Sequence, residues 1–171
     1  SGTEEVIDIE PISSTQNAVL IYSKSQGLRF GQHGVGGTVD NKLILAIIDN
    51  NGQWISADQI TFGRDRIDHQ NWASNSLYNH NKMSMNMDVS PNGTVWVSFF
   101  WADHMEVPNI VQKTSGYGFG VVTWTSANGW ETYNQINFRH DYYVANDITV
   151  DGLGNVYVLG ACSSNLYVGS T

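Results

Sequence analysis

The stretch from Met87 to Phe99, Met-Asp-Val-Ser-Pro-Asn-Gly-Thr-Val-Trp-Val-Ser-Phe, holds two short runs in which apolar and polar residues alternate, joined by Pro-Asn-Gly. Alternation with a period of two is typical of β-strands, and Asn-Gly between two such runs predicts a β-hairpin. The pattern returns from Asp147 to Gly160, and a less regular copy runs from Ile7 to Tyr22. The chain is therefore predicted to consist of repeated hairpins.

A second kind of hairpin alternates with the first. The run from Leu43 to Ile48 is apolar at every position, as in a strand that is covered on both faces. A turn at Asp49 to Gly52 follows, and the chain returns from Trp54 to Phe62. The segment from Gly118 to Phe138 has the same arrangement. Each pair of hairpins thus forms a candidate unit of four strands.

The spacing of the two kinds of hairpin agrees. Trp54 and Trp130 are 130 − 54 = 76 residues apart, and Val19 and Val95 are 95 − 19 = 76 apart. The next step, from Val95 to Val156, is 156 − 95 = 61, and the difference falls within one long connection at residues 63–82. Repeats that change length only in their loops are typical of a stacked-unit fold.

Composition limits the classes of function. Hydrophobic residues make up 41% of the 171 residues and charged residues 14%, which indicates a folded chain. The net charge of −8, with scattered Lys and Arg, argues against nucleic acid as a partner. No apolar run reaches the roughly 20 residues of a membrane helix, so no membrane insertion is expected. Cys162 is the only cysteine and forms no internal disulfide.

Four strands per unit with two tight turns are typical of a β-propeller blade. The segment from Asp147 to Val158, with its Asp, Gly-Asn and Val-Tyr-Val, together with strands that lead into Asn-Gly-Trp, resembles the bacterial propeller repeats of the SBBP type. The resemblance covers nearly the whole chain at the level of pattern. It implies a propeller-type fold and a binding platform, and it transfers no catalytic residue.

We therefore expect an all-β fold of antiparallel, four-stranded, blade-like repeats in a single domain, with a β-sandwich as the alternative. The first unit is predicted at residues 1–62, the second at 83–138 and a partial third at 146–171. Closure of a propeller takes about 4–8 blades, whereas this chain holds about two and a half, so we expect oligomerisation or a longer polypeptide to complete it. The start at Ser1, without Met, indicates a processed or excised piece.

Strand parity places the tight turns at one end of the units and the long connections at the other. All five histidines lie in the long connections, and loops on a rigid scaffold commonly carry function. The predicted ligand-binding residues at that end are Trp72, Tyr78, Trp101, Asp103, His104, His140, Asp141 and Tyr142. Aromatic rings with acids and imidazoles suit a sugar ligand. The alternative is that Trp72 and Trp101 pack against the core or a partner.

No catalytic or metal-binding pattern is present. The five histidines show neither His-x-x-x-His nor His-Glu-x-x-His spacing, so neither a metal site nor a cofactor is predicted. The sequence lacks Gly-x-Ser-x-Gly and a recognisable catalytic pair of carboxylates, and we expect the protein not to be an enzyme.

These features predict a non-catalytic structural or interaction module of a surface, adhesin-type fibre or virion-type assembly. We expect it to bind a protein partner or copies of itself through blade edges and the long-loop face, at an extracellular or virion surface. One alternative is a lectin-like, carbohydrate-binding module that binds a glycan. The other is a hydrolase or lyase fragment on a propeller scaffold, which only the loop histidines suggest.

Overall fold

The computed structural model describes residues 4–36, 41–62, 85–102, 104–113, 117–138, 143–162 and 166–167. Within these ranges the chain forms β-strands in antiparallel sheets, with no helix and no sheet closed into a barrel, which confirms the all-β prediction. The described residues include no helix long and apolar enough to cross a lipid bilayer.

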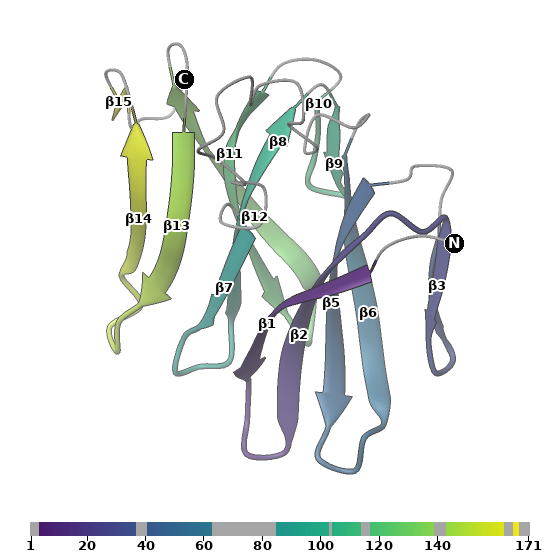
Figure 1. Ribbon diagram of the computed structural model, residues 1–171. Coiled ribbons are helices and arrows are strands. Elements are labelled where there is room, and N and C mark those ends of the chain that lie inside the picture. Colours follow the sequence, from purple (N-terminus) through teal and green to yellow (C-terminus); the bar gives the residue numbers. More distant parts are fainter. Residues whose placement is uncertain are drawn as a thin grey trace.

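The first two predicted units each contain four strands in simple up-and-down order (Figure 1). The strands of the first unit are β1 (Glu4–Pro11), β2 (Gln16–Ser23), β5 (Asn41–Asp49) and β6 (Trp54–Phe62). Those of the second are β7 (Met85–Val89), β8 (Val95–Ala102), β11 (Tyr117–Thr125) and β12 (Gly129–Phe138). The third unit is one hairpin of β13 (Tyr143–Val150) and β14 (Val156–Cys162), and it begins slightly before residue 146.

Short strands follow the second strand of every unit, and all but the last of them lie in segments that the sequence indicated as loops. They are β3 (Gly27–Phe30), β4 (His33–Gly36), β9 (Met105–Val107), β10 (Val111–Lys113) and β15 (Leu166–Tyr167). β9 extends the first sheet at β6, and β15 extends the second sheet at β12. These two insertions therefore add to the outer edge of the preceding unit, whereas β3 and β4 form a separate two-stranded sheet.

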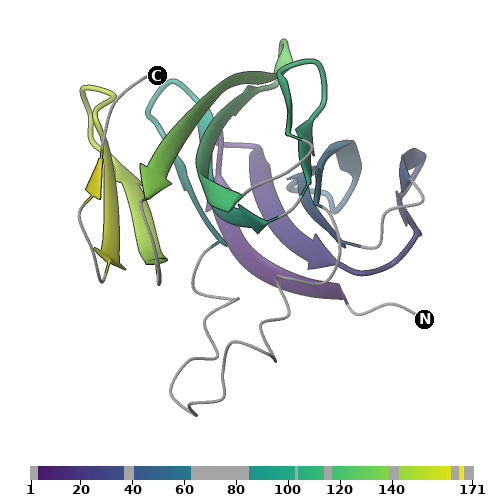
Figure 2. The same cartoon turned by 90° about the horizontal axis from the view of Figure 1, so that it is seen from above.

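The units stack face to face, and Figure 2 shows the three sheets from above. The first two sheets enclose a core that includes Leu20 and Leu45 from the first unit and Met87, Val97 and Phe99 from the second. A β-sandwich also has two facing sheets, but here β13 and β14 add a third layer on the far side of the second sheet. The first strands lie side by side, with β7 between β1 and β13 (Figure 1).

Each unit has two distinguishable faces. In the first unit, we call front face the side that carries the cross-strand pair Val6 and Ile21. The front face of the second unit carries the equivalent pair Met87 and Val97, and that of the third carries Ile148 and Val158. The back face is the opposite side of each sheet, because side chains alternate along a strand. It carries Leu20 in the first unit, Trp96 in the second and Tyr157 in the third. The back of the first unit packs on the front of the second, and the back of the second packs on the front of the third.

Two hydrogen bonds to carboxylates link successive units. The indole Nε1 of Trp124 in the second unit donates to Oδ2 of Asp58 in the first over 2.7 Å. The backbone N–H of Val150 in the third unit donates to Oδ2 of Asp88 in the second over 2.6 Å. Hydrogen bonds to a charged acceptor are stronger than neutral ones, so they fix how the units align.

Glycine at position 120 lets two aromatic rings approach the backbone of β11. A Cβ at this position would lie 2.9 Å from Cζ of Phe99 and 2.8 Å from Cε2 of Tyr133. Both rings pack in the core between the first two units, where Phe99 is fully buried. The absence of a side chain at this position of β11 thus has a packing role.

We expect Gly120→Ala to lower the free energy of unfolding by about 1–3 kcal/mol, the usual cost of overpacking. Urea denaturation measures the change. Gly34→Ala is the matched control because its added Cβ meets nothing within 4 Å. Equal stability losses in the two variants would contradict this role of Gly120.

We expect Asp58→Ala to cost about 1–3 kcal/mol of stability, because it leaves the buried indole N–H of Trp124 without its acceptor. Asp58→Asn retains a side-chain oxygen and is expected to lose less. Comparison of the denaturation midpoints of the two variants tests this contact between units. A smaller loss for the alanine variant would show that the indole finds another acceptor.

Candidate functional site

Most of the predicted ligand-binding residues lie outside the described residues. This group comprises Trp72, Tyr78, Asp103, His140, Asp141 and Tyr142. Trp101 and His104 are described. The candidate site at the long-loop end can therefore be examined at these two positions.

Trp101 is a core residue. Its side chain is 1% exposed and packs between the first two units, and its Nε1 donates to the hydroxyl of Tyr133 over 3.1 Å. Burial raises the pKa of Tyr133 to about 12, although the bond from Trp101 acts in the opposite direction. The ring of Trp101 offers no open face to a sugar, so this residue fits the packing alternative. Its parity with Val97 and Phe99 along β8 is a signal in the sequence for this placement.

His104 is half-buried and directly precedes β9, whose first residue, Met105, is buried in the core. The position of His104 is therefore set by the anchoring of β9 on the edge of β6. Within the described ranges, no three or more His, Cys, Asp or Glu side chains converge as metal ligands would.

Exposed apolar side chains mark the front face of the first unit. Val6 and Ile9 of β1 are 55% and 57% exposed, and they pair across the strands with Ile21 and Val19. We call Val6 and Ile9 the front patch. A hydrophobic cluster with residues of β3 and β4 buries both Val19 and Ile21 to 6% exposure.

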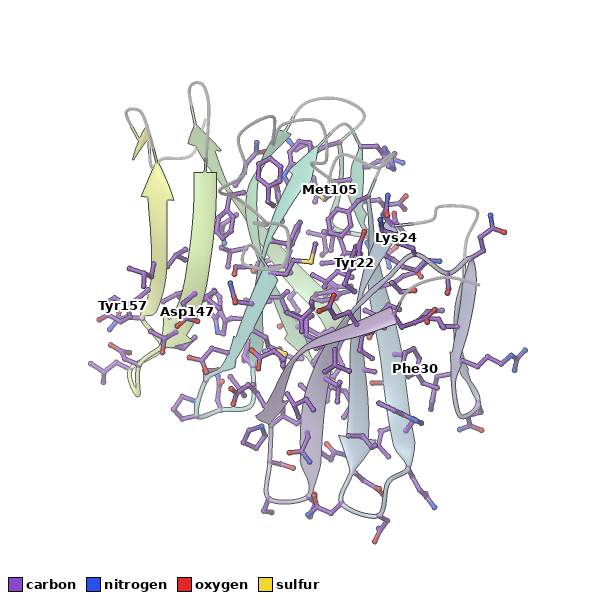
Figure 3. The ribbon with its side chains drawn as sticks, in the orientation of Figure 1. Tyr22, Lys24, Phe30, Met105, Asp147 and Tyr157 are labelled. Carbon is purple, nitrogen blue, oxygen red and sulfur yellow. The ribbon has the colours of Figure 1, made fainter. Side chains whose placement is uncertain are left out.

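The hairpin of β3 and β4 covers only part of that front face. The Phe30 ring meets the ring of Trp54 edge-on, with centroids 5.0 Å apart, and Nε2 of Gln59 donates to the backbone oxygen of Gly36 over 2.7 Å. Both partners belong to β6, so the hairpin is fixed near the outer strand (Figure 3). β1, at the other edge of the sheet, keeps its apolar residues open.

A second exposed patch lies at the opposite end of the stack. Tyr157 and Leu159 of β14 are 55% and 65% exposed, and Figure 3 shows Tyr157 pointing away from the other units. They alternate with Val156 and Val158, which pack on the second unit. We call Tyr157 and Leu159 the back patch, since they lie on the back face of the third unit.

The turn before β14 holds the tyrosine of the back patch. The Tyr157 hydroxyl donates to Oδ2 of Asp151 over 3.1 Å, and the Asn155 side-chain nitrogen donates to the same oxygen over 2.8 Å. Oδ1 of Asp151 accepts the backbone N–H groups of Leu153 and Asn155 over 2.9 Å each. The bonds from Asn155 are the main reason why the pKa of Asp151 is lowered, and the bond to Asp151 raises the pKa of Tyr157.

The sequence pattern does not reveal either patch, because a single apolar residue on a strand does not show which face remains open. Comparison with known proteins gives no further assignment: no protein-family model, no curated protein and no solved structure matches the chain. The resemblance to SBBP-type repeats therefore stays a prediction.

We expect the Asp151 carboxyl to titrate below its ordinary pKa of 3.8, since its hydrogen bonds favour the charged form. A pKa lowered by folding means that the stabilisation is present above the unfolded value and is lost as the pH falls through the folded value. Carboxyl carbon NMR shifts measure the midpoint. Asn155→Ala is expected to raise it, whereas Asn51→Ala, in another turn, leaves it unchanged. A midpoint unaffected by Asn155→Ala would contradict the network.

Proposed function

We propose that the chain is a non-catalytic interaction module made of SBBP-type blades, which assembles with protein partners or copies of itself in a surface, fibre or virion-type structure. The observation that carries the proposal is the pair of exposed apolar patches at the two ends of the stack. Single exposed apolar residues are common on proteins. These four lie on sheet faces of the kind that are buried wherever two units meet inside the chain.

The edges of the sheets offer less surface for assembly than we expected from the sequence. β9 pairs with β6 at the outer edge of the first sheet, and β15 pairs with β12 at the outer edge of the second. The apolar sheet faces are therefore the surfaces on which the proposal rests. Of the residues named for sugar binding, Trp101 is buried, which removes one aromatic ring from the lectin alternative.

We expect light scattering to give a mass above the 18.9 kDa of one chain, increasing with protein concentration. Sodium sulfate is expected to strengthen the association, because it favours burial of apolar surface. An association based on surface charges would instead weaken in salt. A mass of one chain over the whole concentration range, with and without sulfate, would contradict the proposal.

A further inference from the structure

The front patch and the back patch correspond to the two sides of a contact that occurs twice inside the chain. Val6 occupies the position of Met87 in the second unit and of Ile148 in the third, because all three pair with the equivalent residue of the neighbouring strand. Met87 is 3% and Ile148 2% exposed, whereas Val6 is 55% exposed. The difference is that Met87 and Ile148 each face a preceding unit.

Tyr157 of the back patch can be compared with the equivalent residues of the other two units in the same way. The spacings between the hairpins make Tyr157 the equivalent of Trp96 and of Leu20, since 157 − 96 = 61 and 96 − 20 = 76. Leu20 is fully buried against the second unit, and Trp96 packs in the cluster that Ile148 and Val158 of the third unit share. Tyr157 is the member of this series without a following unit in the structure.

We propose that the back patch of one copy docks on the front patch of a second copy, head to tail, by repeating the contact between its own units. This inference rests on the proposed assembly function and names its partner and surfaces. Tyr157 of one copy then lies against Val6 of the next, as Trp96 lies in one cluster with Ile148. An aromatic residue in such a contact is a typical anchor of a protein interface.

The extents of the two surfaces also match. The third unit presents one hairpin, β13 and β14, and not a full sheet of four strands. The front face of the first unit is open along β1, while β3 and β4 already cover the part near β6. A docked hairpin therefore covers the part of the front face that the chain itself leaves open.

Head-to-tail contacts either close into rings or continue as filaments. With about two and a half units per chain, two or three copies fall within the roughly 4–8 blades of closed propellers. The expected particle is thus a ring with two or three times the 18.9 kDa mass of one chain.

The decisive test separates the two patches. The front variant carries Val6→Asp and Ile9→Asp, and the back variant carries Tyr157→Lys and Leu159→Lys. Each variant alone is expected to have the mass of one chain, and an equimolar mixture to associate, because the intact back patch of one fits the intact front patch of the other. Leu153→Lys is the matched control: this residue is 90% exposed at the turn and outside both patches, so the parent mass is expected.

A cross-linking experiment gives a readout that is independent of affinity. Val6→Cys and Tyr157→Cys are placed on separate chains, both with Cys162→Ser, and the chains are mixed under mild oxidation. The expected product joins one chain of each kind. Linked pairs of identical chains would overturn the head-to-tail arrangement. Circular dichroism and melting temperatures near those of the parent establish that all variants fold.

The outcomes distinguish this inference from the proposed function. Suppose that the parent associates. The inference is then wrong if either patch variant alone remains associated, or if the mixture stays monomeric and yields no mixed cross-link. In both cases the assembly function stands. If the parent is a monomer at every concentration, both are wrong.

Discussion

The structure depends on the need to cover a β-sheet that is apolar on both faces. In β5, Leu43, Leu45 and Ile47 pack towards the second unit, whereas Ile44 and Ala46 pack under β3 and β4. Burial of each such side chain contributes about 1.5–3 kcal/mol, so a single sheet of this kind is unstable in water. Both faces of such a sheet must therefore be covered, and in the first unit the second unit covers one face and the β3–β4 hairpin covers part of the other.

An open stack of such units leaves one uncovered face at each end. A chain that ends its stack in isolation needs a polar final face, as terminal repeats of stacked folds show. The back face of the third unit instead carries Tyr157 and Leu159. Hydrogen bonds such as that between Val150 and Asp88 align the inner contacts, and the turn network at Asp151 holds Tyr157 on the open face. The back face of the third unit is thus organised like a face between two units.

The sequence predicts the hairpins well because their signals are local. Alternation and Asn-Gly indicate the strands around Gly93, whose φ of 82° needs glycine, and equal spacing indicates the order of the units. The pairing of β9 with β6 is not local: β9 is short and pairs with residues far away in the chain, so no periodic pattern reveals it. The hairpin signal ends at Phe99 and so places Trp101 in the following connection, whereas β8 extends to Ala102 and includes Trp101. The front and back patches cannot be predicted from such local patterns, because their exposure depends on which sheet faces a neighbouring unit covers.

The inserted strands support the proposal that association uses sheet faces and not the outer sheet edges. An exposed strand edge pairs readily with other chains and promotes uncontrolled aggregation. Here β9 pairs with the edge of β6, and β10, which follows it, has only three residues and ends in Lys113. Short strands and lysine both disfavour further pairing. Pairing through backbone hydrogen bonds accepts many sequences, whereas a face of defined side chains accepts only a complementary one. Short strands at the outer edges of the first two sheets, together with open apolar faces, therefore favour a specific partner over aggregation at those edges.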